Sequence, residues 1–342
     1  MTTRQKIYDL AGPRVQARID RARHAARLLP RVAPDLDGPG ACSGWPDPHR
    51  ACLVVSADLE LAWAWRYANL FDDPLEAALR LAAQSRENVP ALLETFRRFE
   101  LPVTWAVVGH LFLDSCSAPG GRPHPEAERL PYFSNDLWTF PAGDWYEHDP
   151  CSGLSSDPAW YAPDLVDDIR AADERHEIGC HTFSHVDFSD DRCPPEVARF
   201  ELEATLAAAR SRGVEIETMV FPGNRAGNLA ALRDAGFTGY RYHDRAHLDV
   251  PRRDAFGMLR IPGGLCWEKP VGWPVRPWVS ALCRAVDAAI ESGTLLHLWF
   301  HPSCEPVNVE EVFPAVLDHV ASAGDALWRA TMRDVVRRCA AR

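Results

Sequence analysis

The chain has 342 residues, a formal net charge of −11, and apolar and charged shares of 46% and 25%. These values are typical of a globular protein with a substantial core and exclude a fibrous or disordered chain. No run of Lys or Arg forms a basic stripe, so nucleic acid and anionic membrane surfaces are not expected as partners. No apolar stretch is long enough to cross a bilayer, which argues against membrane insertion.

Two features of the chain bear on its location. Residues 1–29 are charged from Arg4 onward and contain no uninterrupted apolar segment of the kind found in secretory signals. The ten cysteines are scattered, without CxxC pairs or the spacing of a small disulfide framework, and this distribution fits a reducing compartment. We therefore predict a cytoplasmic protein, and the sequence is compatible with a monomer or an oligomer.

The N-terminal part is expected to stand apart from the main domain. Residues 1–30 carry apolar side chains at roughly helical spacing, and Pro13 should divide them into a short turn and a longer helix. Residues 30–48 are rich in Pro, Gly and Asp and are typical of a connector. We predict an N-terminal helix and linker over residues 1–48 and one larger domain over residues 49–342.

From residue 51 onward, short apolar runs alternate with helical stretches. Strands are expected at residues 51–57, 103–108, 177–180, 218–221, 239–242, 258–261 and 295–300. Helices are expected at residues 74–99, with a break or kink at Pro90, and at residues 163–174, 194–212, 226–235, 279–291, 309–321 and 331–339. This alternation predicts parallel βα units and an α/β fold. With seven or eight strands, we expect a complete or distorted (β/α)7–8 barrel, in which chemistry takes place where strands end.

Residues 113–161 interrupt this rhythm. The stretch has no clear period but is rich in Trp, Tyr and Pro, and a loop of this length inside a compact domain is usually functional or disordered. Its aromatic content favours a folded lid over the active site. Trp63, Trp145 and Tyr146 are candidates to stack on a sugar ring, although such side chains can equally form a core beneath the lid.

The strongest local motif is HTFSH at residues 181–185, which directly follows the strand expected at residues 177–180. On a helical turn, His181 and His185 would present both imidazoles on one side, which suits two ligands of one metal ion. The alternative is a pair of surface histidines on a loop, because this spacing also arises by chance.

Two carboxylates follow the first predicted strand. Asp58 and Glu60 lie two residues apart, so strand alternation places them on the same side. They could be solvated loop acids, or Glu60 could cap a following helix. Against this reading, a parallel strand so apolar should be buried, and buried carboxylates need a metal ion or a cationic partner.

The last predicted strand also ends in a candidate site residue. His301 lies at the mouth of the strand expected at residues 295–300, just before Pro302. Taken alone, such a histidine is more often a structural residue bonded to a loop carbonyl. His297 lies on the same strand face but deeper, and we expect it to be mainly structural.

Together, the two acids, the HTFSH motif and His301 resemble the polysaccharide deacetylase family (carbohydrate esterase type 4, NodB-homology domain) over about residues 50–340. The family has an aspartate pair after the first strand, an H-[ST]-x-x-H motif after the third, and a late strand that ends in His; the chain has these features in the same order. The segment FPGNR at residues 221–225 resembles the family's third motif, which forms one wall of the groove. The chain departs from the family by spacing its acids as Asp58-Leu59-Glu60 and by placing Arg225 after the proline.

The resemblance implies a distorted deacetylase-type barrel with a metal centre. Glu60, His181 and His185 would bind one divalent ion, with Zn the first choice and Co, Ni, Mn or Fe as alternatives. Asp58 would take a proton from the attacking water as general base, and His301 would protonate the departing amine.

Further residues are assigned by the same resemblance. A backbone N–H near Gly223 or Asn224 would help to bind the oxyanion, and both residues are expected to contact substrate. Arg225 is assigned to steady the base, with Arg241 as the alternative. The family's fourth motif has no clear counterpart, and Trp267 or Asp244 could replace it.

The activity implied is metal-dependent hydrolysis of an amide, namely N-deacetylation of an amino sugar or a sugar-containing intermediate. A small molecule or an oligosaccharide is expected as substrate, because a chain without an export signal meets precursors rather than mature cell wall. One alternative is hydrolysis of a non-sugar amide such as a cyclic amide or ureide. The other is a catalytically inactive binding protein, which predicts lost ligands, whereas the expected ligand set is complete.

Overall fold

The centre of the fold is a curled sheet of parallel strands. The computed structural model describes residues 30–173, 175–244 and 246–341, so the predicted N-terminal helix lies outside the described residues. The sheet has the spatial order β12 (Leu295–Phe300), β1 (Ala51–Leu59), β2 (Thr104–Val107), β5 (Glu177–Cys180), β6 (Thr218–Met219), β7 (Gly239–Tyr242) and β10 (Leu259–Pro262). Adjacent members of this series pair in parallel.

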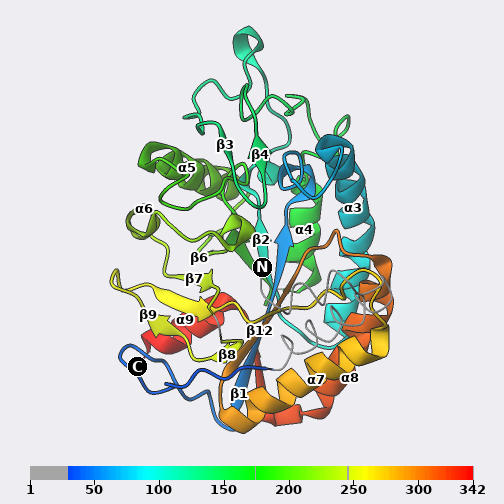
Figure 1. Ribbon diagram of the computed structural model, residues 1–342, viewed down its shortest axis with the longest axis vertical. Coiled ribbons are helices and arrows are strands. Elements are labelled where there is room, and N and C mark those ends of the chain that lie inside the picture. Colours follow the sequence, from blue (N-terminus) through cyan, green and yellow to red (C-terminus); the bar gives the residue numbers. More distant parts are fainter. Residues whose placement is uncertain (1–29, 174, 245, 342) are drawn as a thin grey trace, which may run out of the picture.

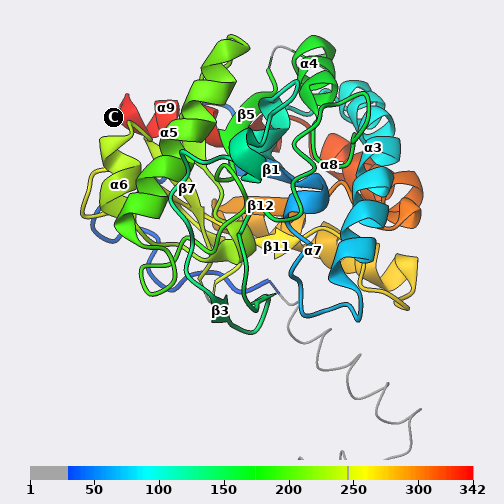
Figure 2. The ribbon, with the colours of Figure 1, turned by 90° about the horizontal axis from the view of Figure 1, so that it is seen from above.

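The two ends of the sheet are joined by a short seam. Two glycines after β10, the short strand β11 (Leu265–Cys266) pairs with β12, so the sheet curls back on itself (Figure 2). Gly264 has φ +58°, and a Cβ atom there would lie 1.9 Å from the carbonyl oxygen of His297, so only glycine fits. The predicted distorted α/β barrel is confirmed.

Strand β1 is an interior strand of the sheet with neighbours on both edges. Every residue from Ala51 to Leu59 is buried, because β12 pairs along one edge while β13 (Leu327–Ala330) and β2 share the other. This full set of neighbours explains why the strand is almost entirely apolar. It also brings the acids that follow the strand into a protected position at the carboxyl ends of the parallel strands.

Helices surround the sheet on its outer side (Figure 1). They are α3 (Pro74–Arg98), α4 (Pro163–Ala172), α5 (Pro195–Ser211), α6 (Leu229–Asp234), α7 (Val275–Ser292), α8 (Phe313–Ser322) and α9 (Met332–Ala340), and a π-helical turn (Asn308–Val312) precedes α8. Among the described residues, no helix combines the length and the apolar character needed to cross a membrane.

Of the break or kink predicted at Pro90, the break is wrong, because α3 continues through this residue. The side chain of Asp73 caps the helix by accepting the N–H of Glu76 at 3.0 Å. Val89 and Leu92, on either side of Pro90, are buried against the barrel. This packing outweighs the one backbone hydrogen bond that a proline cannot donate.

The linker at residues 30–48 lies along the sheet. Val32 forms a bridge with the short strand β8 (Leu248–Asp249), and Ala41 forms one with β9 (Arg252–Arg253). These two strands pair in antiparallel fashion with β12 and β10, respectively. Through them the linker is attached to the barrel.

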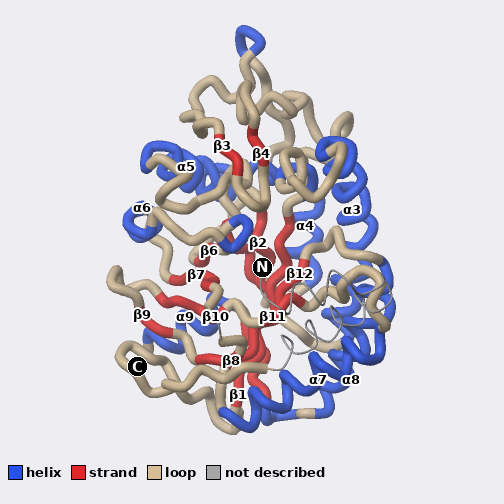
Figure 3. Tube along the Cα trace, viewed as in Figure 1, coloured by secondary structure: helices blue, strands red, loops and turns tan. Residues whose placement is uncertain are grey.

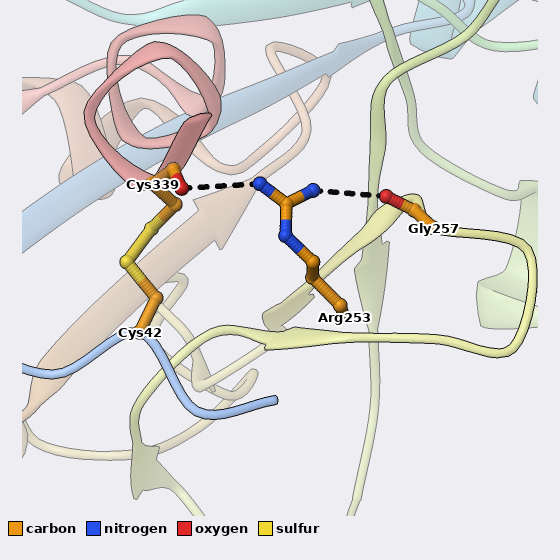
Figure 4. The surroundings of a disulfide bond; sticks show 4 residues. All are labelled: Cys42, Arg253, Gly257 and Cys339. Carbon is orange, nitrogen blue, oxygen red and sulfur yellow. Dashed lines mark hydrogen bonds between the residues drawn. A yellow bond between two sulfur atoms is a disulfide. The ribbon is translucent and has the colours of Figure 1, made fainter. Parts of the chain in front are cut away.

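A disulfide fixes the same linker to the last helix. Cys42 is bonded to Cys339 across a sequence separation of 297 residues. Arg253 lies beside the bond and donates to the carbonyls of Cys339 at 3.1 Å and Gly257 at 2.9 Å (Figure 4). The cysteine spacing gave no indication of this pair. Because disulfides persist mainly in oxidising compartments, the bond argues against the support that the cysteine distribution gave to a cytoplasmic location, which stays a prediction.

The insertion at residues 113–161 is folded although it consists mostly of loops (Figure 3). Its regular part is a hairpin of β3 (Phe133–Ser134) and β4 (Thr139–Phe140). Phe133, Phe140 and Trp145 are buried, and the Phe140 and Trp145 rings meet edge to face at 5.1 Å. The insertion therefore has a small aromatic core of its own.

Candidate active site

The carboxylate of Asp58 is held by Arg241 from β7. Nη1 and Nη2 of the arginine donate to Oδ1 and Oδ2 at 2.8 and 2.6 Å, and both residues are 3% exposed. The same guanidinium donates to Ser56 Oγ at 2.9 Å and to Asn224 Oδ1 at 3.0 Å. This two-point pairing fixes the plane of the Asp58 carboxylate.

His297 is linked to this pair through the Ser56 hydroxyl. Its Nδ1 faces the carbonyl of Pro262 at 3.0 Å and must donate to it, so its Nε2 accepts the hydroxyl proton of Ser56 at 2.8 Å. Burial and the positive charge of Arg241 lower the pKa of His297 well below its ordinary value. The residue is therefore neutral and structural, in accord with its deep position on the strand.

The assignment of Arg225 to the base is corrected by this geometry. Arg225 follows the turn Pro222–Asn224 and forms an ion pair with Asp136 at the tip of the β3–β4 hairpin. Its side chain is therefore engaged by the insertion, and Arg241 is the arginine that holds Asp58.

Glu60 lies between the two histidines of the HTFSH motif. Its Oε1 is 3.0 Å from His181 Nε2 and 3.1 Å from His185 Nε2, and all three residues are buried. Glu60 follows the end of β1, while His181 follows the end of β5. The carboxyl ends of separate parallel strands thus bring these side chains together.

The motif is a tight turn and not the helical turn that the sequence suggested. Thr182 and His185 have φ values of +59° and +60°, which is uncommon for residues other than glycine. The buried carboxylate of Glu201 on α5 accepts the backbone N–H groups of Phe183 and Ser184 at 2.7 Å each. These bonds hold the turn in a conformation that directs both imidazoles toward Glu60.

The protonation pattern of the cluster fits a bound cation. Nδ1 of His181 donates to the carbonyl of Val220 at 2.7 Å, so Nε2 is the ring nitrogen that is turned toward Glu60 and available to a cation. Burial lowers the pKa of His185 and favours its neutral form. Two imidazole nitrogens and one carboxylate form the usual protein ligand set of a catalytic zinc site, and the residues present fit such an ion.

His301 lies on the other side of Glu60 and is oriented by Glu268. Its Nδ1 and its backbone N–H both lie 2.7 Å from Glu268 Oε1, and its Nε2 is 3.9 Å from Glu60 Oε1. Burial opposes a charge on this ring, but the Glu60 and Glu268 carboxylates outweigh it and raise the pKa of His301 to about 10. The ring is thus a proton donor directed toward the cluster.

These groups open into one cavity of about 490 Å³. Asp58, Glu60, His185 and His301 line its floor. Apolar side chains form most of its walls, among them Trp65, Leu70, Leu137, Trp138 and Trp299. Leu137 and Trp138 belong to the tip of the β3–β4 hairpin, so the insertion contributes one wall of the cavity, as expected for a lid.

The three aromatic residues predicted to contact substrate do not line this cavity. Trp63, Trp145 and Tyr146 are each at most 3% exposed. The indole N–H of Trp145 donates to Ser184 Oγ at 2.9 Å, and the phenol of Tyr146 donates to Glu201 at 3.2 Å. Trp145 and Tyr146 thus support the HTFSH turn, while Trp63 donates to the Trp160 carbonyl at 3.2 Å. All three are packing residues, which corrects the expectation of sugar stacking by these side chains.

Gly223 and Asn224 do line the cavity, with different consequences. Gly223 has φ +56°, and a Cβ atom there would lie 2.5 Å from the Trp138 ring, so glycine lets the hairpin tip approach. The backbone N–H of Asn224 already donates to the Phe221 carbonyl at 2.9 Å, and its side chain accepts from Arg241. Asn224 therefore orients Arg241, and Gly223 is the better candidate for an oxyanion donor.

Sequence reasoning missed Glu268, which takes the place expected for Trp267 or Asp244. Trp267 is fully buried and packs on Phe313 with ring centroids 4.2 Å apart, while Asp244 lines a separate cavity. The available signal was that Glu268 lies two residues after β11. This strand pairs with β12, which ends directly before His301. Its two-residue strand was too short to recognise.

The fold is a curled α/β barrel, and its site has a buried His–His–Glu cluster between an Asp–Arg pair and a His–Glu pair. These features define the class of protein, a barrel hydrolase with a candidate metal centre. A family model described as Polysaccharide deacetylase matches residues 68–243, slightly more than half of the chain. The chain belongs to the polysaccharide deacetylase family. The matched range contains both histidines of the HTFSH motif and Arg241, whereas Asp58, Glu60 and His301 lie outside it.

Solved structures share the fold at low sequence identity. A protein of Mycobacterium smegmatis assigned to the polysaccharide deacetylases has a TM-score of 0.62 and 17% identity, covering 89% of this chain and 95% of its own. A similarly assigned protein of Pseudomonas aeruginosa PAO1 has a TM-score of 0.59 and 16% identity, covering 86% and 92%. PuuE allantoinase has a TM-score of 0.61 and 15% identity, covering 90% and 96%. The comparison with curated proteins gave no match.

Proposed function

We propose that this chain is a metal-dependent N-deacetylase that acts on an amino sugar or a small sugar-containing intermediate. The observation that carries the proposal is the convergence of Glu60, His181 and His185 in one cavity with a fixed carboxylate and an oriented imidazole. These are the parts that hydrolysis of an unactivated amide requires: a cation site, a base and an acid.

In this proposal Glu60, His181 and His185 hold one divalent ion, with Zn²⁺ the first choice and Co²⁺, Ni²⁺, Mn²⁺ or Fe²⁺ compatible with the same ligands. When bound, such an ion supplies Lewis acidity to the acyl carbonyl and lowers the pKa of a water molecule toward neutrality.

The protein's own groups carry the proton transfers. A carboxylate can accept about four hydrogen bonds, and the Arg241 guanidinium donates two to Asp58. Asp58 therefore has lone pairs left and receives the proton of the attacking water. His301 donates its Nε2 proton to the departing nitrogen, since an amine is too basic to leave unprotonated. Glu268 keeps the His301 ring turned toward the cluster throughout.

The cavity supports a small substrate. A volume of about 490 Å³ suits one or two sugar rings, and the indole walls can contact the apolar faces of a pyranose. A second candidate is hydrolysis of a cyclic amide or ureide, which is favoured by the largely apolar walls and by the fold shared with PuuE allantoinase.

An acetate-release screen tests the proposal. The purified chain is loaded with Zn²⁺ or Co²⁺, and acetate release is measured on N-acetylated sugars and nucleotide sugars. Hydrolysis of cyclic amides and ureides is measured in parallel as loss of the substrate. We expect acetate from the sugar set and a loss of about 10²- to 10⁴-fold in kcat for Asp58→Asn, with metal content unchanged. Turnover of cyclic amides alone would select the second candidate, and full activity of Asp58→Asn would contradict the assigned base.

A further inference from the structure

A second cluster of metal-binding side chains lies in the insertion, apart from the active site. Within the described residues, His110, Cys116, His124 and Asp149 each offer one ligand atom, and these atoms all lie within 4.8 Å of one another. His110 belongs to the short helix η2 (Gly109–Phe112) after β2, and the other three come from the insertion. Four separate positions between His110 and Asp149 therefore meet at one point.

The two imidazoles direct their lone pairs at the same carboxylate oxygen. Nδ1 of His110 faces the carbonyl of Trp160 at 3.2 Å and must donate to it. Nδ1 of His124 faces the carboxylate of Glu126 at 3.4 Å. In the neutral rings these contacts leave lone pairs on both Nε2 atoms. Those atoms lie 3.1 and 2.9 Å from Asp149 Oδ2 and 3.1 Å from each other.

Such a convergence of acceptors requires positive charge at its centre. A proton on His124 Nε2 would serve its contacts with Asp149 and His110, but the His110 Nε2 lone pair would still face Asp149 Oδ2 at 3.1 Å without a donor between them. A cation satisfies His110, His124 and Asp149 together. The contacts at Nδ1 are those that usually orient histidines bound to a metal ion, because they fix the tautomer with Nε2 free to coordinate.

The remaining groups complete a closed site. Cys116 Sγ lies 3.4 Å from Asp149 Oδ2, so its thiolate can fill a fourth position. The other carboxylate oxygen, Oδ1, accepts the phenol of Tyr161 at 3.1 Å and the N–H of Cys151 at 3.0 Å, which leaves Oδ2 for coordination. Two nitrogens, one thiolate and one carboxylate are a tetrahedral set that suits zinc.

We propose that His110, Cys116, His124 and Asp149 bind a second divalent ion of the zinc type with a structural role. The side chains of His110 and Asp149 are fully buried and the four ligands leave no open position, in contrast to the active site. A surface cavity of about 500 Å³ lined by Cys116, His124 and Glu126 gives the ion a path to the site.

The site would connect the insertion to the catalytic turn. The backbone N–H groups of Gly109 and His110 donate to the carbonyls of Thr182 and Phe183 at 2.7 and 2.9 Å. On the other side, the His124 ring contacts Tyr146 at a centroid distance of 5.0 Å, and the Tyr146 phenol contacts the glutamate that fixes the HTFSH turn. The second ion would thus anchor the lid beside the turn that carries His181 and His185.

Cobalt substitution distinguishes this site from the catalytic one. A Co²⁺ ion bound by Cys116 gives a thiolate-to-cobalt charge-transfer band, which the His–His–Glu cluster of the active site cannot produce. We expect two equivalents of Co²⁺ and this band in the full-length wild type. His181→Ala/His185→Ala should keep one equivalent and the band, whereas Cys116→Ser should lose the band. Cys151→Ser, a free cysteine of the same insertion, is the matched control and should keep it.

The wild type alone can overturn the proposal, even if Cys116→Ser fails to fold. The proposal would be contradicted if the wild type shows no band and binds a single Co²⁺ ion that is lost in His181→Ala/His185→Ala. A band that persists in folded Cys116→Ser would also contradict it.

Alkylation of Cys116, located by mass spectrometry, is the independent measure. We expect the zinc-loaded protein to react at Cys116 only after chelation, and equal reactivity with and without chelator would contradict the site. None of these readouts depends on deacetylase activity.

Discussion

At the residue scale, the position of Arg241 makes a sharp prediction about Asp58, the proposed base. Arg241→Lys keeps a positive charge but replaces the two-point fork with a single ammonium group, so the Asp58 carboxylate loses its fixed plane. We expect kcat to fall about ten- to a hundredfold, because a hydrogen bond to a charged group contributes about 1.5–3 kcal/mol. Steady-state kinetics measure this, with circular dichroism to check folding.

Arg225→Lys is the matched control for this experiment. Arg225 pairs with Asp136 at the hairpin tip and does not contact Asp58. We expect little change in kcat and at most an altered KM, because that ion pair is partly exposed. A larger loss of kcat from Arg225→Lys than from Arg241→Lys would contradict the assignment.

Glu268 is expected to act as a positioning residue for His301. Glu268→Ala removes the acceptor at Nδ1 and leaves the ring free to rotate, whereas Glu268→Gln keeps an acceptor oxygen in the same place. We expect kcat to fall in both variants, with the glutamine variant at least several-fold more active than the alanine variant. KM should change little, since Glu268 does not line the cavity. Equal activities of the two variants would argue against an orienting role.

The site residues that could be predicted are those that follow clear strands. Asp58 and Glu60 follow β1, and the two histidines follow β5, so hydrophobic runs were enough to indicate their positions. Arg241 was harder to place, because the proline motif drew attention to Arg225, and only packing decides which guanidinium enters the barrel.

At the element scale, the seam of the barrel depends on one glycine. Gly264→Ala would place a Cβ atom 1.9 Å from the backbone oxygen of His297, on the strand that carries His301. Because backbone atoms cannot move aside as a side chain does, we expect a loss of about 3 kcal/mol or more in the free energy of unfolding. Urea unfolding followed by tryptophan fluorescence measures the loss.

Gly213→Ala separates the steric effect from the cost of left-handed backbone. Gly213 has φ +65°, close to the +58° of Gly264, but a Cβ atom there would meet nothing within 4 Å. We expect this variant to lose only about 1–2 kcal/mol. Comparable losses in the two variants would mean that the seam tolerates the extra atom.

The elements that the sequence predicted well are long or strongly apolar. Strands β5, β7 and β12 have their predicted bounds, and each is almost entirely buried and contains β-branched, aromatic or other apolar residues. The two-residue strands β8 and β9 were missed, since their pairing depends on the linker and neighbouring strands and leaves no periodic pattern. The aperiodic insertion likewise hid the cluster around Asp149, whose members approach one another only in the folded chain.

At the scale of the whole molecule, the Cys42–Cys339 bond should contribute to stability by limiting the unfolded chain. We expect Cys42→Ser to lower the free energy of unfolding by about 2–4 kcal/mol in non-reducing buffer. Cys283→Ser, at a half-buried free cysteine on α7, is the control and should change stability little. Equal stability of Cys42→Ser and the wild type, or a thiol titration that finds both cysteines reduced, would contradict the prediction.

The same bond closes the chain into a covalent ring that contains both ligand clusters. A protease that cuts one peptide bond in the insertion would open this ring without releasing a fragment, because Cys42 and Cys339 still join the two pieces. Native protein nicked in this way would migrate as a single species on a denaturing gel until reductant is added, and two bands would then separate. Digestion experiments on this protein therefore reveal cleavage of the insertion only when the gel is run under reducing conditions.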